Sequence, residues 1–332
     1  MNIDEFKSIK ITPLLETLEL SDIDDDTYFK LDYISNSRLK YINPEQGGSP
    51  AKYFKGMESL YSNSIVFGSA VHGLVLQPEE FSLAMDVDRP TSKAGFMADD
   101  LYPKFKETGI ITKEDIIRSS KKIGYYADSL TSNRILALRE KCEQYWLDRS
   151  KSTDNLFLDS KSREAVITCV NSLKNNKEIQ KLLHPEGIIS KPISLNEQAI
   201  ILSFKIEMPG YDPFNLTVKG KLDNFTIDLD SNSLVLNDLK TTGHLINEFS
   251  NSYEFFHYAR QMGLYGYLIM QYAQKKYNQK FKLSGNMLLV STVPEYKSGI
   301  FKVKGTDFLK GFAEFKALLK LVAYYTIHKD EI

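Results

Sequence analysis

Three strand-like runs follow one another directly after Pro192, and they constrain the fold of this chain more than any other feature. They are rich in β-branched and aromatic residues, and the turn-forming segments MPGYDPFN and DLDSNS separate them. The runs are ISLNEQAIILSFKIEM (193–208), NLTVKGKLDNFTIDL (215–229) and SLVLNDLKTT (233–242). Because only short turns join them, we expect neighbouring antiparallel strands.

A helical pattern over 251–278 follows the third run. Next come a strand at 285–293, a turn at PEYKSG, a strand at 300–303 and a closing helix at about 306–328. Consecutive strands, one long helix and further strands predict an α/β (α+β) fold, in which helices flank a central mixed β-sheet.

The part of the chain before Pro192 reads as mostly helical. Residues 1–33 are acidic and predict a flexible N-terminal arm or a peripheral segment, and Ser49 with Pro50 predicts a helix start. An apolar helix is expected over 63–81 and one or two amphipathic helices over 160–183, with a charged helical layer inserted at about 82–155. We therefore predict an arm at 1–33 and a single domain at 34–332.

Composition narrows the class of protein. Of the 332 residues, 42% are hydrophobic and 26% charged, which is typical of a globular protein. No apolar run is long enough for a membrane span, so no membrane partner is expected. Cys142 and Cys169 are too few for an iron–sulfur cluster and predict free thiols in a reducing compartment, the cytoplasm. The formal net charge of −1 leaves nucleic-acid binding to a local groove.

Asp238 and Lys240 carry charge inside the apolar run SLVLNDLKTT. Side chains two residues apart on a strand point to the same face, and Asp223 lies on the preceding strand. If the turn pairs these strands, both carboxylates lie beside the lysine, which suits Mg²⁺ or Mn²⁺ and phosphodiester hydrolysis. Read alone, Asp238 and Lys240 fit an ordinary ion pair on a solvated face better than a site, because such tripeptides are common.

Other polar residues have a spacing that suits a functional site, and each also has a purely structural interpretation. His72 follows Gly68 by four residues in GSAVHGLVLQPEEF, where a core histidine is the alternative. Glu197 opens the first strand, where a solvated strand residue is the alternative. Gln261 and Tyr265 share a helix face, where tyrosines more often pack a core.

Taken in order, these motifs resemble those of the PD-(D/E)XK nuclease superfamily. The motifs are G-x-x-x-H (68–72), Glu197, G-x-x-D (220–223), D-L-K-T-T (238–242) and Q-x-x-x-Y (261–265). The chain looks most like the RecB-like and exodeoxyribonuclease VIII branch, which includes phage recombination exonucleases. The resemblance spans about residues 34–300 and implies a restriction-endonuclease-like core, although Leu222 replaces the motif proline.

The resemblance implies a role for each matching residue. The metal ligands would be His72, Asp223, Asp238 and the main-chain carbonyl of Leu239, for one or two Mg²⁺ or Mn²⁺ ions. Lys240 would be the catalytic lysine, and Glu197 a further acidic site residue. DNA contacts are expected from Gln261, Tyr265, Arg260, Arg38, Ser37 and Ser35.

The function implied is metal-dependent exonuclease activity on linear double-stranded DNA, with 5′-to-3′ resection for recombination. Ser35, Ser37 and Arg38 offer hydroxyl and guanidinium donors for a terminal phosphate, and a capped surface helix is the alternative reading. Expected partners are DNA ends, a single-strand annealing recombinase and further copies in a ring. The expected location is the bacterial cytoplasm, for a bacterial protein or for a phage protein in its host.

Two other functions fit the same residues. An endonuclease of this fold would share the site, and circular DNA as a substrate would separate the two activities. A nuclease fold kept only for DNA binding or assembly would not need Asp223, Asp238 and Lys240 together.

Overall fold

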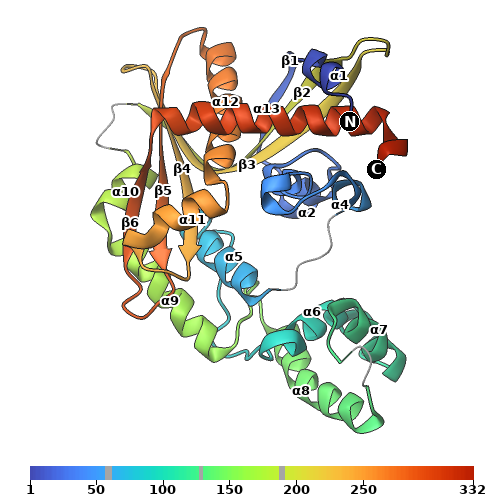
Figure 1. Cartoon of the computed structure of the whole chain (residues 1–332). Helices are drawn as coiled ribbons and strands as arrows, with labels where there is room; N and C mark the ends of the chain where they lie inside the picture. The colour runs from blue at the N-terminus through green and yellow to red at the C-terminus, as the bar shows by residue number, and fades with distance from the viewer. Residues whose placement is uncertain (57–61, 127–129, 187–190) are drawn as a thin grey trace. The chain divides into compact units, whose positions relative to one another are not determined.

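A computed structural model describes residues 1–56, 62–126, 130–186 and 191–332 (Figure 1). The chain divides into two compact units, one of Met1–Glu58 with Leu173–Ile332, and one of Ser59–Ser172. This division differs from the predicted arm at 1–33 and single domain at 34–332. The predicted helical layer at 82–155 lies inside the second unit, which is larger than the layer.

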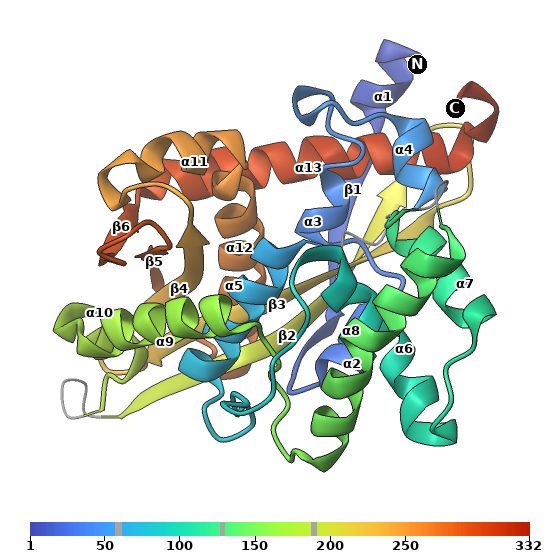
Figure 2. The same cartoon turned by 90° about the horizontal axis from the view of Figure 1, so that it is seen from below.

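The first unit is built on a six-stranded sheet, which confirms the predicted mixed α/β fold. The strand order follows the chain, and β2 and β3 run side by side over most of their length (Figure 2). The β4–β5 pair is parallel and the other pairs are antiparallel. The strands are β1 Lys10–Ser21, β2 Pro192–Glu207, β3 Phe214–Asp228, β4 Ser233–Thr242, β5 Lys282–Ser291 and β6 Ser298–Val303.

Within the segment 1–33, which was predicted to be a flexible arm or a peripheral segment, β1 forms an edge strand of this sheet. It pairs antiparallel with β2, and Ile9 and Leu18 join the apolar core. Helices α1 (Ile3–Ser8) and α2 (Asp25–Lys30) flank the strand. The segment is acidic, but apolar side chains of KITPLLETLEL, among them Leu18 and Leu20, pack against the core of the sheet.

Helices complete the first unit. The predicted helix at 251–278 is interrupted at His257, whose φ of 53° lies in the left-handed region. The predicted caps at Ser49 and Pro50 are confirmed, since Ser49 accepts from the Lys52 backbone N–H. The segments are α3 Asn36–Leu39, η1 Pro44–Gln46, α4 Pro50–Lys55, α10 Lys177–Leu183, η2 Ile246–Glu248, α11 Phe249–Phe255, α12 Tyr258–Tyr277, α13 Gly305–Ile327 and η3 Lys329–Glu331.

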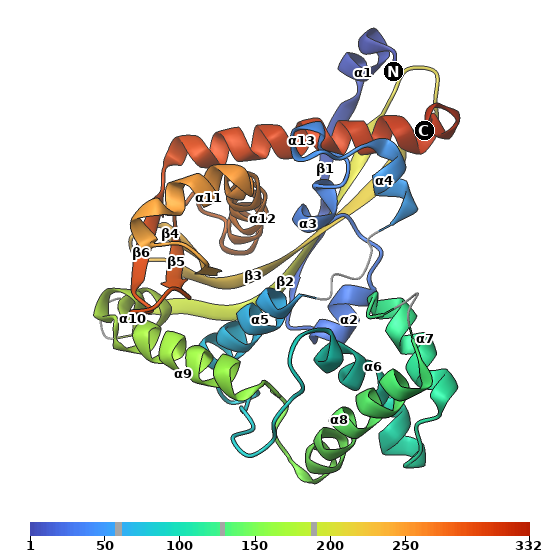
Figure 3. The ribbon, with the colours of Figure 1, turned by 60° about the horizontal axis from the view of Figure 1, so that its bottom comes forward.

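The long helices α12 and α13 cross in close contact (Figure 3). A Cβ atom on Gly311 of α13 would lie 1.7 Å from the Ala259 carbonyl oxygen of α12, so only glycine permits this approach. Both helices contribute to the core that covers the sheet, including Leu264, Leu268 and Phe315. This packing fixes the start of α12, where Gln261 and Tyr265 lie.

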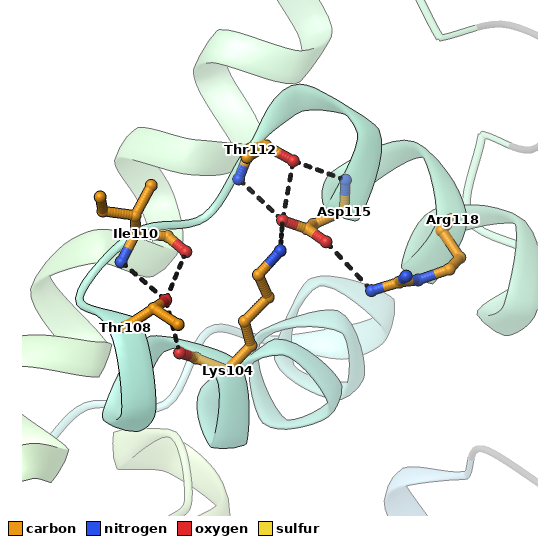
Figure 4. A network of polar contacts seen from close by, with 6 residues as sticks. All are labelled: Lys104, Thr108, Ile110, Thr112, Asp115 and Arg118. Atoms are coloured by element: carbon orange, nitrogen blue, oxygen red, sulfur yellow. Dashed lines mark hydrogen bonds and ion pairs between the residues drawn. The ribbon is translucent and has the colours of Figure 1, made fainter.

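The second unit is helical in its described residues. Its core gathers around Trp146 and Tyr145, and Cys142 and Cys169 are buried and not part of a disulfide. Thr112 is the N-cap of α7, and a network of polar contacts centred on Asp115 surrounds this helix start (Figure 4). The helices are α5 Asn63–Leu76, α6 Ser92–Thr108, α7 Lys113–Ile123, α8 Ser132–Lys151 and α9 Ser160–Asn175, whose end falls in the first unit. Among the described residues, no helix is long and apolar enough to cross a membrane.

Candidate active site

The β3–β4 pair brings Asp223 and Asp238 together, as their spacing predicts. The register pairs Asn224 with Asn237, so the two aspartates are the next residues at the end of this ladder. The backbone N–H of Leu239 donates to Asp223 Oδ2 at 2.7 Å. Asp238 is only 1% exposed, so its charge requires partners within the protein.

Lys240 is the first such partner. Its Nζ lies 2.6 Å from Asp238 Oδ2 and 5.5 Å from the centre of the Tyr258 ring. Burial lowers the pKa of Lys240, but the charges of Asp238 and Asp223 outweigh it and hold the pKa above its ordinary value. The pair is therefore a buried ion pair, rather than the surface pair that its sequence also allowed.

Glu197 lies opposite Asp223 at an irregular point of the β2–β3 ladder. The register pairs the flanking residues, Asn196 with Asn224 and Gln198 with Leu222, but it does not pair Glu197 with Asp223. Glu197 has a φ of 52°, a left-handed conformation that is uncommon for a residue other than glycine. Burial first, and then the charge of Asp223, raise the pKa of Glu197 to about 7.

Helix α12 supports the site from one face of the sheet. The Nε2 of Gln261 donates to Asp238 Oδ1 at 2.7 Å, so this side chain, which was expected to contact DNA, contacts an acid of the site. Tyr265, one turn later, packs on Gly220 of β3. A Cβ atom on Gly220 would lie 2.8 Å from the Tyr265 ring, which explains why a glycine stands three residues before Asp223.

The acidic side chains of the first unit suit a divalent cation. Glu197, Asp223 and Asp238 offer carboxylate oxygens, the ligands that Mg²⁺ and Mn²⁺ prefer. Burial raises the pKa of Asp223, and the charge of Lys240 and the Leu239 N–H only partly offset it. A cation would relieve this crowding of negative charge. The donor set therefore fits the predicted metal, while the role of the Leu239 carbonyl stays a prediction.

His72 is the remaining predicted metal ligand. It lies on α5, which belongs to the second unit. The glycine after it, Gly73, packs on Phe81 so closely that a Cβ atom would lie 2.7 Å from the Phe81 ring. This explains Gly73 by packing, and a metal-binding role for His72 stays a prediction.

Ser35, Ser37 and Arg38 line a cavity of about 570 Å³ in the first unit, together with Gln261 and Tyr265. Ser35 also caps α3, because its hydroxyl accepts from the Arg38 N–H at 3.3 Å. The capped helix and the pocket are thus both present. Five of the six predicted DNA contacts line one cavity.

Two lysines of this cavity were missed at the sequence level. Lys219 and Lys221 line it from β3, and both share the face of Asp223 because they alternate with it along the strand. Lys219 Nζ donates to the carbonyl oxygens of Tyr28 and Leu31 at 2.6 and 2.7 Å. The period of two in KGKLD was the signal that would have found them.

Carboxylates already pair with several cations of this cavity. Lys221 Nζ pairs with Asp25 and lies 3.1 Å from Glu197 Oε2. Arg38 pairs with Asp32, whose side chain is 89% exposed. Both partners, Asp25 and Asp32, come from the acidic segment that the sequence assigned to a free arm.

Arg260, also predicted to contact DNA, is instead only 1% exposed. Its guanidinium donates to Asn36 Oδ1, Gln46 Oε1 and Glu314 Oε1 at 2.8 to 2.9 Å. Arg260 therefore ties α12 to α3, η1 and α13.

No family model and no curated protein matches the chain. Among solved structures, the chain is similar to a crystal structure from Eubacterium rectale whose protein is named "Putative exonuclease". The superposition covers 94% of this chain and 88% of that chain, with a TM-score of 0.46 and 10% sequence identity. At this TM-score the likeness assigns no function to the chain.

Proposed function

We propose that this protein is a Mg²⁺- or Mn²⁺-dependent nuclease that degrades linear double-stranded DNA from its ends. One observation carries the proposal: Asp223, Asp238 and Glu197 converge with Lys240 at the end of the β3–β4 ladder. This combination of acids and a lysine is typical of active sites in the PD-(D/E)XK superfamily, which the sequence motifs resemble. Within that superfamily, we propose the exodeoxyribonuclease VIII-like branch for this chain.

The chain's own residues would divide the reaction between them. Asp223 and Asp238 would hold the metal, with Glu197 for a second ion and His72 as a further ligand. A bound Mg²⁺ supplies Lewis acidity at the phosphate. The Lys240 ammonium would orient the attacking water and steady charge on the phosphate oxygens, while Gln261 fixes the Asp238 carboxylate.

The cavity beside the site is suited to a DNA end. Ser35, Ser37 and Arg38 face it together with Lys219 and Lys221, which are hydroxyl and cationic groups of the kind that bind phosphate. A terminal 5′-phosphate held there would set the polarity of degradation, 5′ to 3′. Tyr265 and Gln261 line the same cavity and would join this end pocket to the acids.

Resection of this kind would expose single strands for an annealing recombinase in the bacterial cytoplasm. A ring of several copies would keep the enzyme on its DNA despite the near-neutral net charge of −1. Light scattering tests the ring, since a monomer at working concentration would remove this part of the proposal.

The decisive experiment compares three DNA substrates with the full chain. The substrates are an end-labelled linear duplex with 5′-phosphates, the same duplex with 5′-hydroxyls, and a closed circular plasmid. We expect Mg²⁺-dependent degradation of the linear duplexes, faster with 5′-phosphates, and none after EDTA is added. Cleavage of the plasmid would indicate an endonuclease instead, and binding without cleavage would indicate a DNA-binding module.

Two variants test the site itself. Lys240→Ala should lower kcat by about 10²–10³-fold, the usual cost of losing one fixed charge-stabilising donor. Asp238→Ala should lower it at least as much. Asp228→Asn, at the far end of β3, is the matched control, and circular dichroism checks that all three proteins fold. If both site variants cleave at the wild-type rate, the site assignment is wrong.

A further inference from the structure

Two neighbouring phenylalanines project from the end of α11. The side chains of Phe255 and Phe256 are 74% and 51% exposed, and their rings meet edge to face at 5.0 Å. Exposed apolar clusters of this kind on a soluble surface indicate an interaction site. They lie in the segment 243–257, which connects the site strand β4 to the site helix α12.

A chain of ring contacts joins this pair to the candidate active site. The Phe256 ring lies 5.6 Å from the Tyr258 ring, and the Tyr258 ring lies 5.5 Å from Lys240 Nζ. Phe249 stacks on Tyr258 at 5.8 Å and supports it. One DNA strand advances about 3.4 Å per nucleotide, so the pair lies within a few nucleotides of a phosphate bound at Lys240.

A cavity of about 400 Å³ opens beside the two rings, in the size range of small-ligand pockets. Its lining surface is mostly apolar, and four polar residues beside the aromatic pair carry hydrogen-bonding groups that suit base edges. The lining residues are His244, Glu248, Asn251, Ser252, Phe255 and Phe256. This lining contains no lysine or arginine and does contain a glutamate, so it suits a neutral base rather than a phosphate.

We propose that Phe255 and Phe256 form a stacking platform for nucleobases of the DNA strand whose backbone lies at Lys240. The proposal rests on the proposed nuclease function and adds a base-binding subsite to it. The two surfaces then take different parts of DNA, since the cavity of Lys219, Lys221 and Arg38 takes phosphate and the platform takes bases. Stacking on aromatic rings is tolerant of sequence because every base has a π face.

The test measures binding of a fluorescein-labelled 12-nucleotide single strand to the full chain in Ca²⁺, by anisotropy. A second probe has the same backbone with abasic sites in place of the bases. Phe255→Ala and Phe256→Ala should each weaken binding of the intact probe roughly five- to hundred-fold. Both should leave binding of the abasic probe unchanged. Leu309→Ala on α13 is the matched control, because Leu309 is 75% exposed and lies outside the platform.

A spectroscopic variant makes the same test independently of affinity. Trp146 is the one tryptophan of the chain and is buried in the second unit, so Phe256→Trp adds a distinct exposed fluorophore. Its emission should be quenched by the intact probe and not by the abasic probe, whereas Leu309→Trp should respond to neither.

The outcomes separate the two proposals. Cleavage by the wild type, with equal affinity of wild type and Phe variants for both probes and no quenching, would overturn the platform and leave the nuclease standing. That result would assign the rings to a protein partner instead. Failure of the wild type to bind or cleave any DNA would overturn the proposed function and the platform with it.

Discussion

Asp115 in the second unit and Asp223 in the first are both carboxylates with partners, yet their pKa values shift in opposite directions. Asp115 accepts from Lys104, from the Thr112 hydroxyl and backbone N–H, and from Arg118 (Figure 4). These bonds, the one from Lys104 first, hold its pKa below the ordinary range.

Asp223 lies in the opposite electrostatic environment. Burial raises its pKa, and the Lys240 charge and one N–H from Leu239 only partly compensate. Its neighbour Glu197 adds a second acid, whose pKa the Asp223 charge raises in turn. The two acids differ in their surroundings: hydrogen-bond donors surround Asp115, whereas the charge of Asp223 is only partly compensated and a bound cation would offset it.

The largest effect should come from Asp223→Asn. We expect a loss of activity of at least about 10³-fold, because a metal ligand supplies several kcal/mol of charge stabilisation. The free energy of unfolding should stay equal or rise, since the amide keeps the bond from Leu239 N–H and removes the like charge beside Glu197. Single-turnover cleavage and urea titration followed by circular dichroism measure the two quantities. A variant that is inactive and also strongly destabilised would show that Asp223, like Asp115, stabilises the fold.

Asp115→Asn should have the opposite effect. It should destabilise the second unit and leave the rate of DNA cleavage unchanged. Trp146 fluorescence reports this unit, and we expect a lower urea midpoint at pH 7. The folded pKa lies below the unfolded value of 3.8, so the stabilisation is present above that pH and is lost as the pH falls below it. The difference in stability between the two proteins should therefore shrink progressively as the pH falls below 3.8, and it should close only as the pH approaches the much lower folded pKa. A constant difference from pH 7 to pH 3 would contradict this account.

Thr112→Ala should have a smaller effect on the same network. It removes the hydroxyl that caps α7 and bonds to Asp115, at a cost of about 1 kcal/mol in the free energy of unfolding. Urea titration with Trp146 fluorescence measures it, and Thr112→Ser is the control that keeps the hydroxyl. Equal losses in both variants would assign the effect to the methyl group rather than to the cap.

Asp32→Asn should have the smallest effect, and on binding rather than on stability. Asp32 is exposed, so its pair with Arg38 contributes at most about 1 kcal/mol. Removing its charge leaves Arg38 to a phosphate, and binding of the 5′-phosphorylated duplex in Ca²⁺ should tighten about two- to five-fold. Asp22→Asn is the control on the same acidic segment. Equal tightening in both variants would indicate a general charge effect.

Much of the sheet and of its acids could be predicted because local pattern decides them. The short turn DLDSNS pairs β3 with β4, so Asp223 and Asp238 had to meet once the strands were recognised. The i, i+4 spacing of Gln261 and Tyr265 likewise put both on the face toward the site. The pairing of β1 could not be predicted from local spacing, because its partner β2 lies far along the chain.

Local sequence pattern was enough to predict the order of strands β2 to β6, and to predict that Asp223, Asp238 and Lys240 share one face of neighbouring strands. Periodicity is local, and a period of two fixes which side chains point together. Tertiary structure decided what surrounds them: the burial of Arg260, the irregular backbone at Glu197, and the pairing of Lys221 with Asp25. These depend on segments that are distant in the chain, and burial and charge act through space rather than along the sequence.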